Sequence, residues 1–231
     1  MTRTEGTGPP LLAPVISYAV LTICAVVVPP LIAGVQPWTS DAALLDFFQH
    51  HPGAAHASAF FTIGAAIPFA VATAVATTRL RTLGLDVPGR IIAQIGGTVA
   101  AAMLTVAGVC TLAATQGRVA ESAVAVRTLD GLTFAAGGPG FVVFAGLLAA
   151  GVSAAGLLGR VLPRWLGWFG IAVAAVSELA CLAAAFDGAD FLLPIGRFGG
   201  LIWLVAVGVA LPATRRELRA RRGIVRTADV S

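Results

Sequence analysis

Residues 165–212 read WLGWFGIAVAAVSELACLAAAFDGADFLLPIGRFGGLIWLVAVGVALP, and they contain two long apolar stretches separated by the polar turn Asp187-Gly188-Ala189-Asp190. A helix needs ~20 predominantly apolar residues to cross the hydrocarbon core of a bilayer, and each stretch is about that long. The turn between them carries two carboxylates, which favour water over hydrocarbon. This part of the sequence therefore predicts a helical hairpin that crosses a membrane twice.

The rest of the chain repeats the same alternation of apolar and polar stretches. Of the 231 residues, 58% are apolar and 11% are charged, which is too little charge to cover the surface of a soluble domain of this size. We therefore predict an all-α fold, an integral membrane bundle of six transmembrane helices. The predicted spans are Leu11–Val35, Ala57–Thr78, Ile91–Thr115, Leu132–Gly159, Trp165–Phe186 and Phe191–Pro212.

The 15 basic residues are all arginines, and they are sorted between alternate polar stretches. If neighbouring polar stretches face opposite sides of the membrane, twelve arginines share the side of both termini. The other three, Arg118, Arg127 and Arg197, face the opposite side. Basic segments are retained on the cytoplasmic side during insertion, so this sorting predicts that both termini are cytoplasmic.

This topology divides the chain into three parts. Residues 1–10 form a cytoplasmic tail, residues 11–212 form the transmembrane domain, and residues 213–231 form a basic cytoplasmic tail. Because the basic tail directly follows a span, we expect it to lie against anionic lipid headgroups rather than to bind nucleic acid. The partners expected from the sequence are the lipid bilayer and a second copy of the chain or another membrane protein.

Several membrane chemistries need residues that the sequence lacks. There is no lysine for a retinal Schiff base and no HExxH pair for an intramembrane zinc protease. The predicted spans contain no aspartate for an aspartyl protease and no histidine pair for a b-type haem. We therefore predict no cofactor.

Glu178 is the one acidic residue placed deep within a predicted span, where an ionisable side chain costs at least ~2.5 kcal/mol. Helical phase places it on the face that carries the small residues of its helix, which predicts that it faces the bundle interior. Arg197 is the candidate partner, because both residues lie roughly 14–15 Å from the Gly188 turn at 1.5 Å rise per residue. Such a pair would either fix the hairpin or act as a switchable site for a proton or cation.

The polar segment after the first span contains all three histidines of the chain. Residues 39–51 are expected to form a short amphipathic helix whose apolar side lies on the membrane surface. Asp46 and His50 are four residues apart and share a helical face, and His56 follows. These three residues are weak candidate ligands for zinc, and no metal site is predicted.

Gly137-Gly138-Pro139-Gly140 lies within the fourth apolar stretch. One interpretation is a helix that starts there, with Pro139 in its first turn. The other is a break in a longer helix that lines a cavity, where water or a ligand satisfies the free backbone groups.

Three segments resemble an uncharacterised family of actinobacterial multi-span membrane proteins, the DUF4386-like group of unknown function. They are residues 137–143 (GGPGFVV), residues 162–166 (LPRWL) and residues 193–200 (LPIGRFGG). The resemblance implies a multi-pass protein of a bacterial plasma membrane and assigns no catalytic residue. We therefore expect a non-enzymatic structural or partner-binding membrane component. The alternative is a small oligomeric transporter or channel that uses Glu178 and Arg197.

Overall fold

The computed structural model describes residues 10–34 and 40–220, and within these ranges every regular element is a helix. Six helices are long and apolar enough to cross a membrane, which confirms the predicted bundle. The elements are α1 (Leu12–Ala33), α2 (Asp41–His50), α3 (Pro52–Thr82), α4 (Pro88–Ala114), α5 (Gly117–Glu121), α6 (Ala123–Ala135), the π-helix η1 (Ala136–Gly140), α7 (Phe141–Leu158), α8 (Arg164–Leu179), the 3₁₀ helices η2 (Ala180–Ala184) and η3 (Asp187–Ala189), and α9 (Leu192–Ala210).

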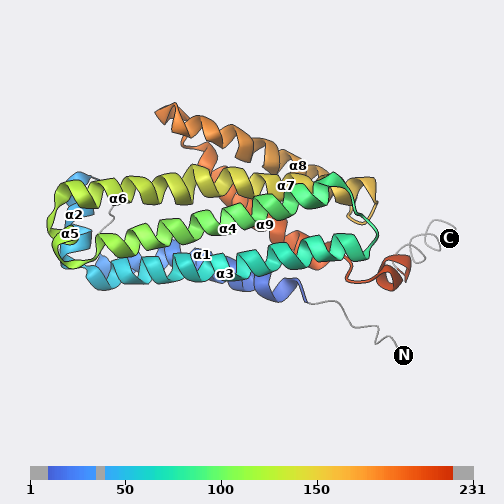
Figure 1. Ribbon diagram of the computed structural model, residues 1–231, viewed down its shortest axis with the longest axis horizontal. Helices are drawn as coiled ribbons and strands as arrows, with labels where there is room; N and C mark the ends of the chain where they lie inside the picture. The colour runs from blue at the N-terminus through green and yellow to red at the C-terminus, as the bar shows by residue number, and fades with distance from the viewer. Residues whose placement is uncertain (1–9, 35–39, 221–231) are drawn as a thin grey trace.

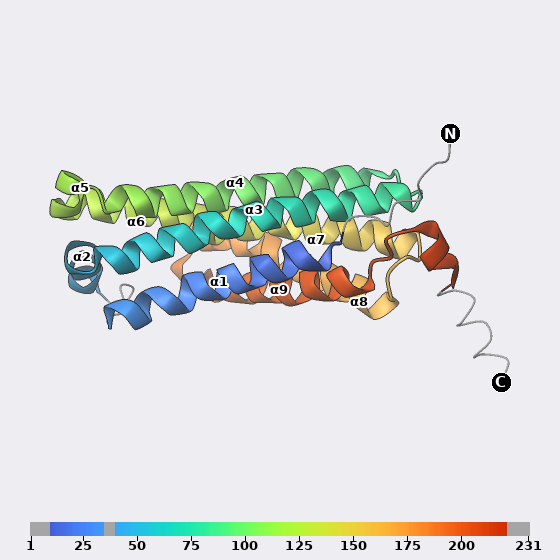
Figure 2. The same ribbon diagram turned by 90° about the horizontal axis from the view of Figure 1, so that it is seen from below.

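The six spans form one elongated bundle (Figures 1 and 2). Helix α3 packs mainly on α1 and α4, α4 packs on α7, α7 packs on α8, and α8 packs on α9. Helix α1 begins and α9 ends at one end of the bundle, here called the terminal end. The short helices α2 and α5 lie at the opposite end, here called the far end (Figure 2).

The fourth span is longer than the sequence predicted. It runs continuously from Ala123 to Leu158 through α6, η1 and α7, whereas the predicted span began at Leu132. The prediction was based on hydropathy, and it left out the first part of this helix because Arg127 and Asp130 are charged. The structure places these charges on α6, near the far end, where the helix extends beyond the α8–α9 hairpin (Figure 1).

Small residues let the central helices approach closely. Gly151 on α7 lies against the backbone of α4, so a Cβ at this position would overlap the carbonyl oxygen of Gly89 and the Ala93 side chain. Larger side chains, among them Leu104, Leu148 and Trp203, fill the core around these contacts. This is the packing expected in lipid, where helices associate through close van der Waals contact rather than through the hydrophobic effect.

Helix α2 forms where the sequence predicted it, and the Ser40 side chain accepts a hydrogen bond from the Ala43 backbone N–H (3.1 Å). Its expected position on the membrane surface is wrong, however. Phe47 and Phe48 are buried against a small cluster that includes Val126 of α6. The apolar side of α2 therefore closes the far end of the bundle instead of facing lipid.

Candidate functional site

Arg197 lies in the second turn of α9, because the helix begins at Leu192 and Pro194 falls within its first turn. A proline is tolerated there, since the first amide groups of a helix have no intrahelical acceptor. The helix therefore stays continuous and carries Arg197 into the membrane-spanning part of the bundle. The Arg197 side chain is half-buried.

The guanidinium of Arg197 donates a hydrogen bond from Nη1 to the carbonyl oxygen of Gly137 (2.9 Å). This carbonyl is available because of the π-helix η1, in which the Phe141 N–H bonds to the Ala136 carbonyl, five residues back. The Phe141 N–H also reaches the carbonyl of Gly138, three residues back, and so passes over Gly137, its usual α-helical acceptor four residues back. Arg197 therefore supplies the donor that the helix itself does not provide.

The π-helix η1 decides whether Gly137-Gly138-Pro139-Gly140 is the start of a helix or a break within a longer one. The helix does not start at this segment but runs through it, with a π-helical turn in place of regular α-helix. Pro139 has no N–H, which removes one α-helical hydrogen bond and favours the wider turn. The segment is a break within a long helix, and Gly137 and Gly138 line a cavity.

Aromatic rings surround the other side of the guanidinium. Arg197 Cζ lies 5.2 Å from the ring centroid of Phe141, a distance that fits a cation–π contact. The Phe141 ring packs on Phe69 (5.4 Å between centroids), and Phe69 packs on Tyr18 (4.9 Å). Arg197 Nε is buried and has no hydrogen-bond partner in the described structure. The Arg197 guanidinium is thus held in place, while its Nε–H donor has no acceptor among the described residues.

Arg197 lines an open cavity of about 370 Å³ between α1, α3, α4, the α6–α7 helix and α9. The walls are mainly apolar, and besides Arg197 the polar side chains are Thr62 and Thr133. Pockets of roughly 300–1,000 Å³ with apolar walls and few polar groups are typical of small-molecule sites. The residues that line the cavity are Ala25, Val26, Thr62, Leu104, Ala107, Thr133, Phe134, Gly137, Gly138, Val142, Leu193, Pro194, Arg197 and Phe198.

Glu178 does not join this site. Among the ion pairs of residues 10–34 and 40–220, none connects Glu178 with Arg197. The predicted matching depth of Glu178 and Arg197 in the membrane agrees with the structure. Their preceding residues, Ser177 and Gly196, face each other, since a Cβ at Gly196 would lie 3.0 Å from Ser177 Oγ. The predicted rotation does not agree, because Glu178 is exposed and its carboxylate lies beside Gly146 of α7.

The physical reason is the face that α8 buries. Leu166, Gly170, Val173 and Ser177 pack into the bundle, so the buried face contains large and small residues together. The prediction assigned small residues to the interior and Val173 to lipid. In a helix this rich in alanine and glycine, residue size alone does not identify the packed face.

The outer histidines are only partly brought together. His50 Nδ1 lies 2.9 Å and His51 Nε2 lies 3.6 Å from the carboxylate of Asp46. His56 is separate, with Nδ1 2.7 Å from the Pro52 carbonyl and Nε2 3.3 Å from Thr115 Oγ1. In the part of the chain that the structure describes, no group of three histidine, cysteine or acidic side chains could hold a metal ion.

Sequence reasoning identified Arg197 but missed the groups that surround it. The aromatic residues Tyr18, Phe69 and Phe141 come from three different helices, and no spacing in the sequence connects them. One signal pointed to Gly137: the fourth apolar stretch is longer than a span requires, so a break within it was available from length alone.

Together these features define the class: a polytopic α-helical integral membrane protein with a half-buried cation beside an apolar cavity. Comparison with protein-family models, with curated proteins and with solved structures gave no match to this chain. The candidate function therefore depends on the geometry of the cavity.

Proposed function

We propose that the protein is a non-enzymatic membrane component that binds an apolar molecule with one anionic headgroup in the cavity at Arg197. The observation that carries this proposal is a guanidinium that lines an apolar cavity of about 370 Å³ and has no carboxylate within 4.0 Å among the described residues. A cation without a counter-ion in a membrane-spanning segment is costly, and an anionic ligand would supply the missing charge. The apolar walls would hold its hydrocarbon part.

The alternative transporter or channel that uses Glu178 and Arg197 as a coupled pair has less support. Its coupling site requires the two groups to interact, but Glu178 lies beside Gly146 of α7 while Arg197 bonds to Gly137, nine residues earlier in the chain. A binding role needs Arg197 alone.

Binding can be tested with the purified full chain in nanodiscs and a fluorescent long-chain fatty acid, compared with the corresponding alcohol. The acid should bind better than the alcohol by roughly tenfold to a hundredfold, the value of one charge-assisted hydrogen bond. Arg197→Gln should remove this difference. Ala25→Phe, which fills the cavity but keeps Arg197 on Gly137, should weaken binding of both probes.

Arg118→Gln is the matched control, because Arg118 is an exposed arginine of α5 outside the cavity. It should bind both probes like the wild type. Equal affinity of the wild type for acid and alcohol, or unchanged binding by Ala25→Phe, would contradict the proposal.

We also propose that both termini are cytoplasmic and that the membrane is a bacterial plasma membrane. The arginine sorting supports this orientation, and the terminal end carries the start of α1 and the end of α9 together (Figure 2). The resemblance to the DUF4386-like group supports the bacterial location and stays a prediction. We likewise propose, from the sequence, that the protein can form homo-oligomers.

The orientation can be measured with single cysteines in a variant that lacks Cys24, Cys110 and Cys181. A membrane-impermeant maleimide should label Ser122→Cys, at the far end, in intact cells. It should label Thr82→Cys, at the terminal end, only after the cells are permeabilised. The reverse pattern would show that the termini lie outside.

A further inference from the structure

The loop between α7 and α8 lies at the terminal end of the bundle and has an unusual backbone (Figure 1). Arg160 adopts φ +51°, the left-handed region that favours glycine. The Val161 N–H bonds to the Gly156 carbonyl (2.9 Å) and the Arg160 N–H bonds to the Leu157 carbonyl (3.2 Å), the two hydrogen bonds of a Schellman motif. The helix end therefore holds an arginine where glycine is the usual residue.

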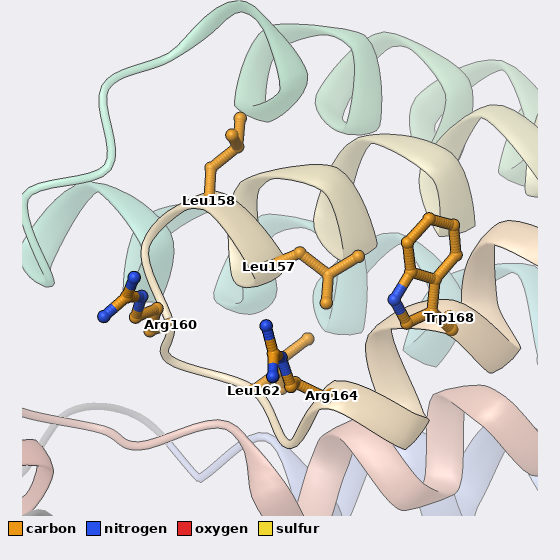
Figure 3. Close-up of a pocket in the computed structure, with 6 residues that line it drawn as sticks. All are labelled: Leu157, Leu158, Arg160, Leu162, Arg164 and Trp168. Carbon is orange, nitrogen blue, oxygen red and sulfur yellow. The ribbon is translucent and has the colours of Figure 1, made fainter.

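This loop borders an open pocket of about 600 Å³. Figure 3 shows Arg164 extending from the first turn of α8, between Arg160 on the loop and Trp168 on α8. Leu157, Leu158 and Leu162 complete the lining, so the described residues around the pocket supply two cations, apolar walls and no acidic side chain. Its charge and its surface suit a ligand that is anionic at one end and apolar at the other.

The position of the pocket along the membrane axis agrees with such a ligand. The apolar span of α8 begins at Arg164, so the two arginines lie at the headgroup level. Leu158 is 77% exposed and Trp168 is 65% exposed, and both belong to helices that are apolar enough to cross a membrane. Tryptophan is enriched at this depth because its ring is apolar and its N–H is polar.

The start of α8 adds to the positive potential. Pro163 precedes the helix, and no side chain caps the first-turn amides. The positive end of the helix dipole thus lies in the same turn as Arg164. Basic pockets between spans on the cytoplasmic side are suited to anionic lipid headgroups.

We propose that this pocket binds the phosphate of an anionic phospholipid through Arg160 and Arg164, with an acyl chain against Leu158 and Trp168. The site is separate from the Arg197 cavity, and it does not depend on the proposed function of that cavity. A phosphate from solution would use the two arginines alone, whereas the exposed leucine and tryptophan contribute only to the binding of a lipid.

The test measures lipid retained by the purified full chain in detergent, by native mass spectrometry, with phosphatidylglycerol, phosphatidylcholine or inorganic phosphate added. The wild type should retain phosphatidylglycerol in preference to phosphatidylcholine, and inorganic phosphate should not compete at equal concentration. The double variant Arg160→Gly/Arg164→Gln should weaken phosphatidylglycerol binding by roughly thirtyfold, the value of two arginines near an anionic headgroup.

Misfolding would not explain this loss, because glycine at position 160 suits the left-handed backbone better than arginine does. The double variant Arg81→Gln/Arg216→Gln is the charge-matched control, because it removes two exposed arginines outside the pocket, and it should retain the lipid. Unchanged lipid retention in the double variant overturns the proposal. Competition by inorganic phosphate at equal concentration also overturns it, because the pocket would then be a site for a soluble anion.

Discussion

At the scale of single residues, Gly170 is the glycine of α7, α8 and α9 with the least space around it. A Cβ at this position would overlap Ser153 Oγ from α7 and Trp203 Nε1 from α9. Both polar atoms are buried and have no hydrogen-bond partner in the described structure. Glycine is therefore required at this contact by space rather than by backbone conformation.

Gly170→Ala should lower the free energy of unfolding by about 1–3 kcal/mol, because the methyl group forces Trp203 and Ser153 apart. Thermal unfolding in detergent measures this change. Gly131→Ala on α6 is the control, since a Cβ at this position meets no atom within 4 Å. The control should be neutral or up to about 1 kcal/mol more stable. Equal stability of the two variants would mean that the α8 contact relaxes without cost.

At the scale of elements, the α6–η1–α7 helix connects the far end of the bundle to the Arg197 cavity. The π-helical turn contains one more residue per turn than the α-helix on either side, so it sets the rotation of α6 relative to α7. Thr133 on α6 depends on this rotation, because its hydroxyl lies 3.3 Å from Thr111 Oγ1 of α4.

Deleting Gly138 should turn α6 by about 100° relative to α7, the rotation of one helical residue. In a variant without the native cysteines, Thr111→Cys and Thr133→Cys should form a disulfide in the full-length chain. The deletion should abolish this crosslink, which non-reducing electrophoresis detects. Pro139→Ala keeps the length of the chain and should keep the crosslink. A crosslink that survives the deletion would show that the turn does not set the register.

The sequence contained enough information for the spans and too little for the rotations. Hydropathy reports how far a helix runs through lipid, and all six spans followed from it. The direction of the Glu178 side chain depends on the rotation of α8. The hydrogen bond from Arg197 to the Gly137 carbonyl depends on the change from α-helical to π-helical hydrogen bonding at η1. Both come from packing between distant segments, such as Ser177 against Gly196, which local periodicity does not encode.

At the scale of the whole molecule, the segment after α9 closes the terminal end. The buried Arg79 of α3 donates from Nη1 to the Leu211 carbonyl (2.8 Å), and Arg215 Nε donates to the Thr82 carbonyl (3.0 Å). In the basic tail, Arg215 thus contacts α3, whereas Arg216 and Arg219 are exposed. The lipid contact expected for the tail stays a prediction, and the part beyond residue 220 lies outside the described residues.

Arg79→Leu should leave the Leu211 carbonyl without this donor, at a cost of about 1.5–3 kcal/mol for a hydrogen bond to a charged group. The segment should then detach, and limited trypsin digestion should cut faster after Arg215 and Arg216. Arg81→Leu, at an exposed position of the same helix, should be cut at the rate of the wild type. Equal rates for both variants would exclude Arg79 as the anchor.

The unequal lengths of the spans have a consequence for the surrounding lipid. Helix α3 has 31 residues, while the α8 span has 20, which correspond to about 46 Å and 30 Å at 1.5 Å per residue. A hydrocarbon core is ~30 Å thick, so the short hairpin matches it and determines where the bilayer surface lies. Glu178 is five residues before Ala183, the last residue of the α8 span, and most of that stretch is the 3₁₀ helix η2. At about 1.5–2.0 Å per residue, this puts Glu178 about 8–10 Å from that surface. Its exposed carboxylate is then within reach of water at the rim of the shortest helix, and it needs no basic partner inside the protein.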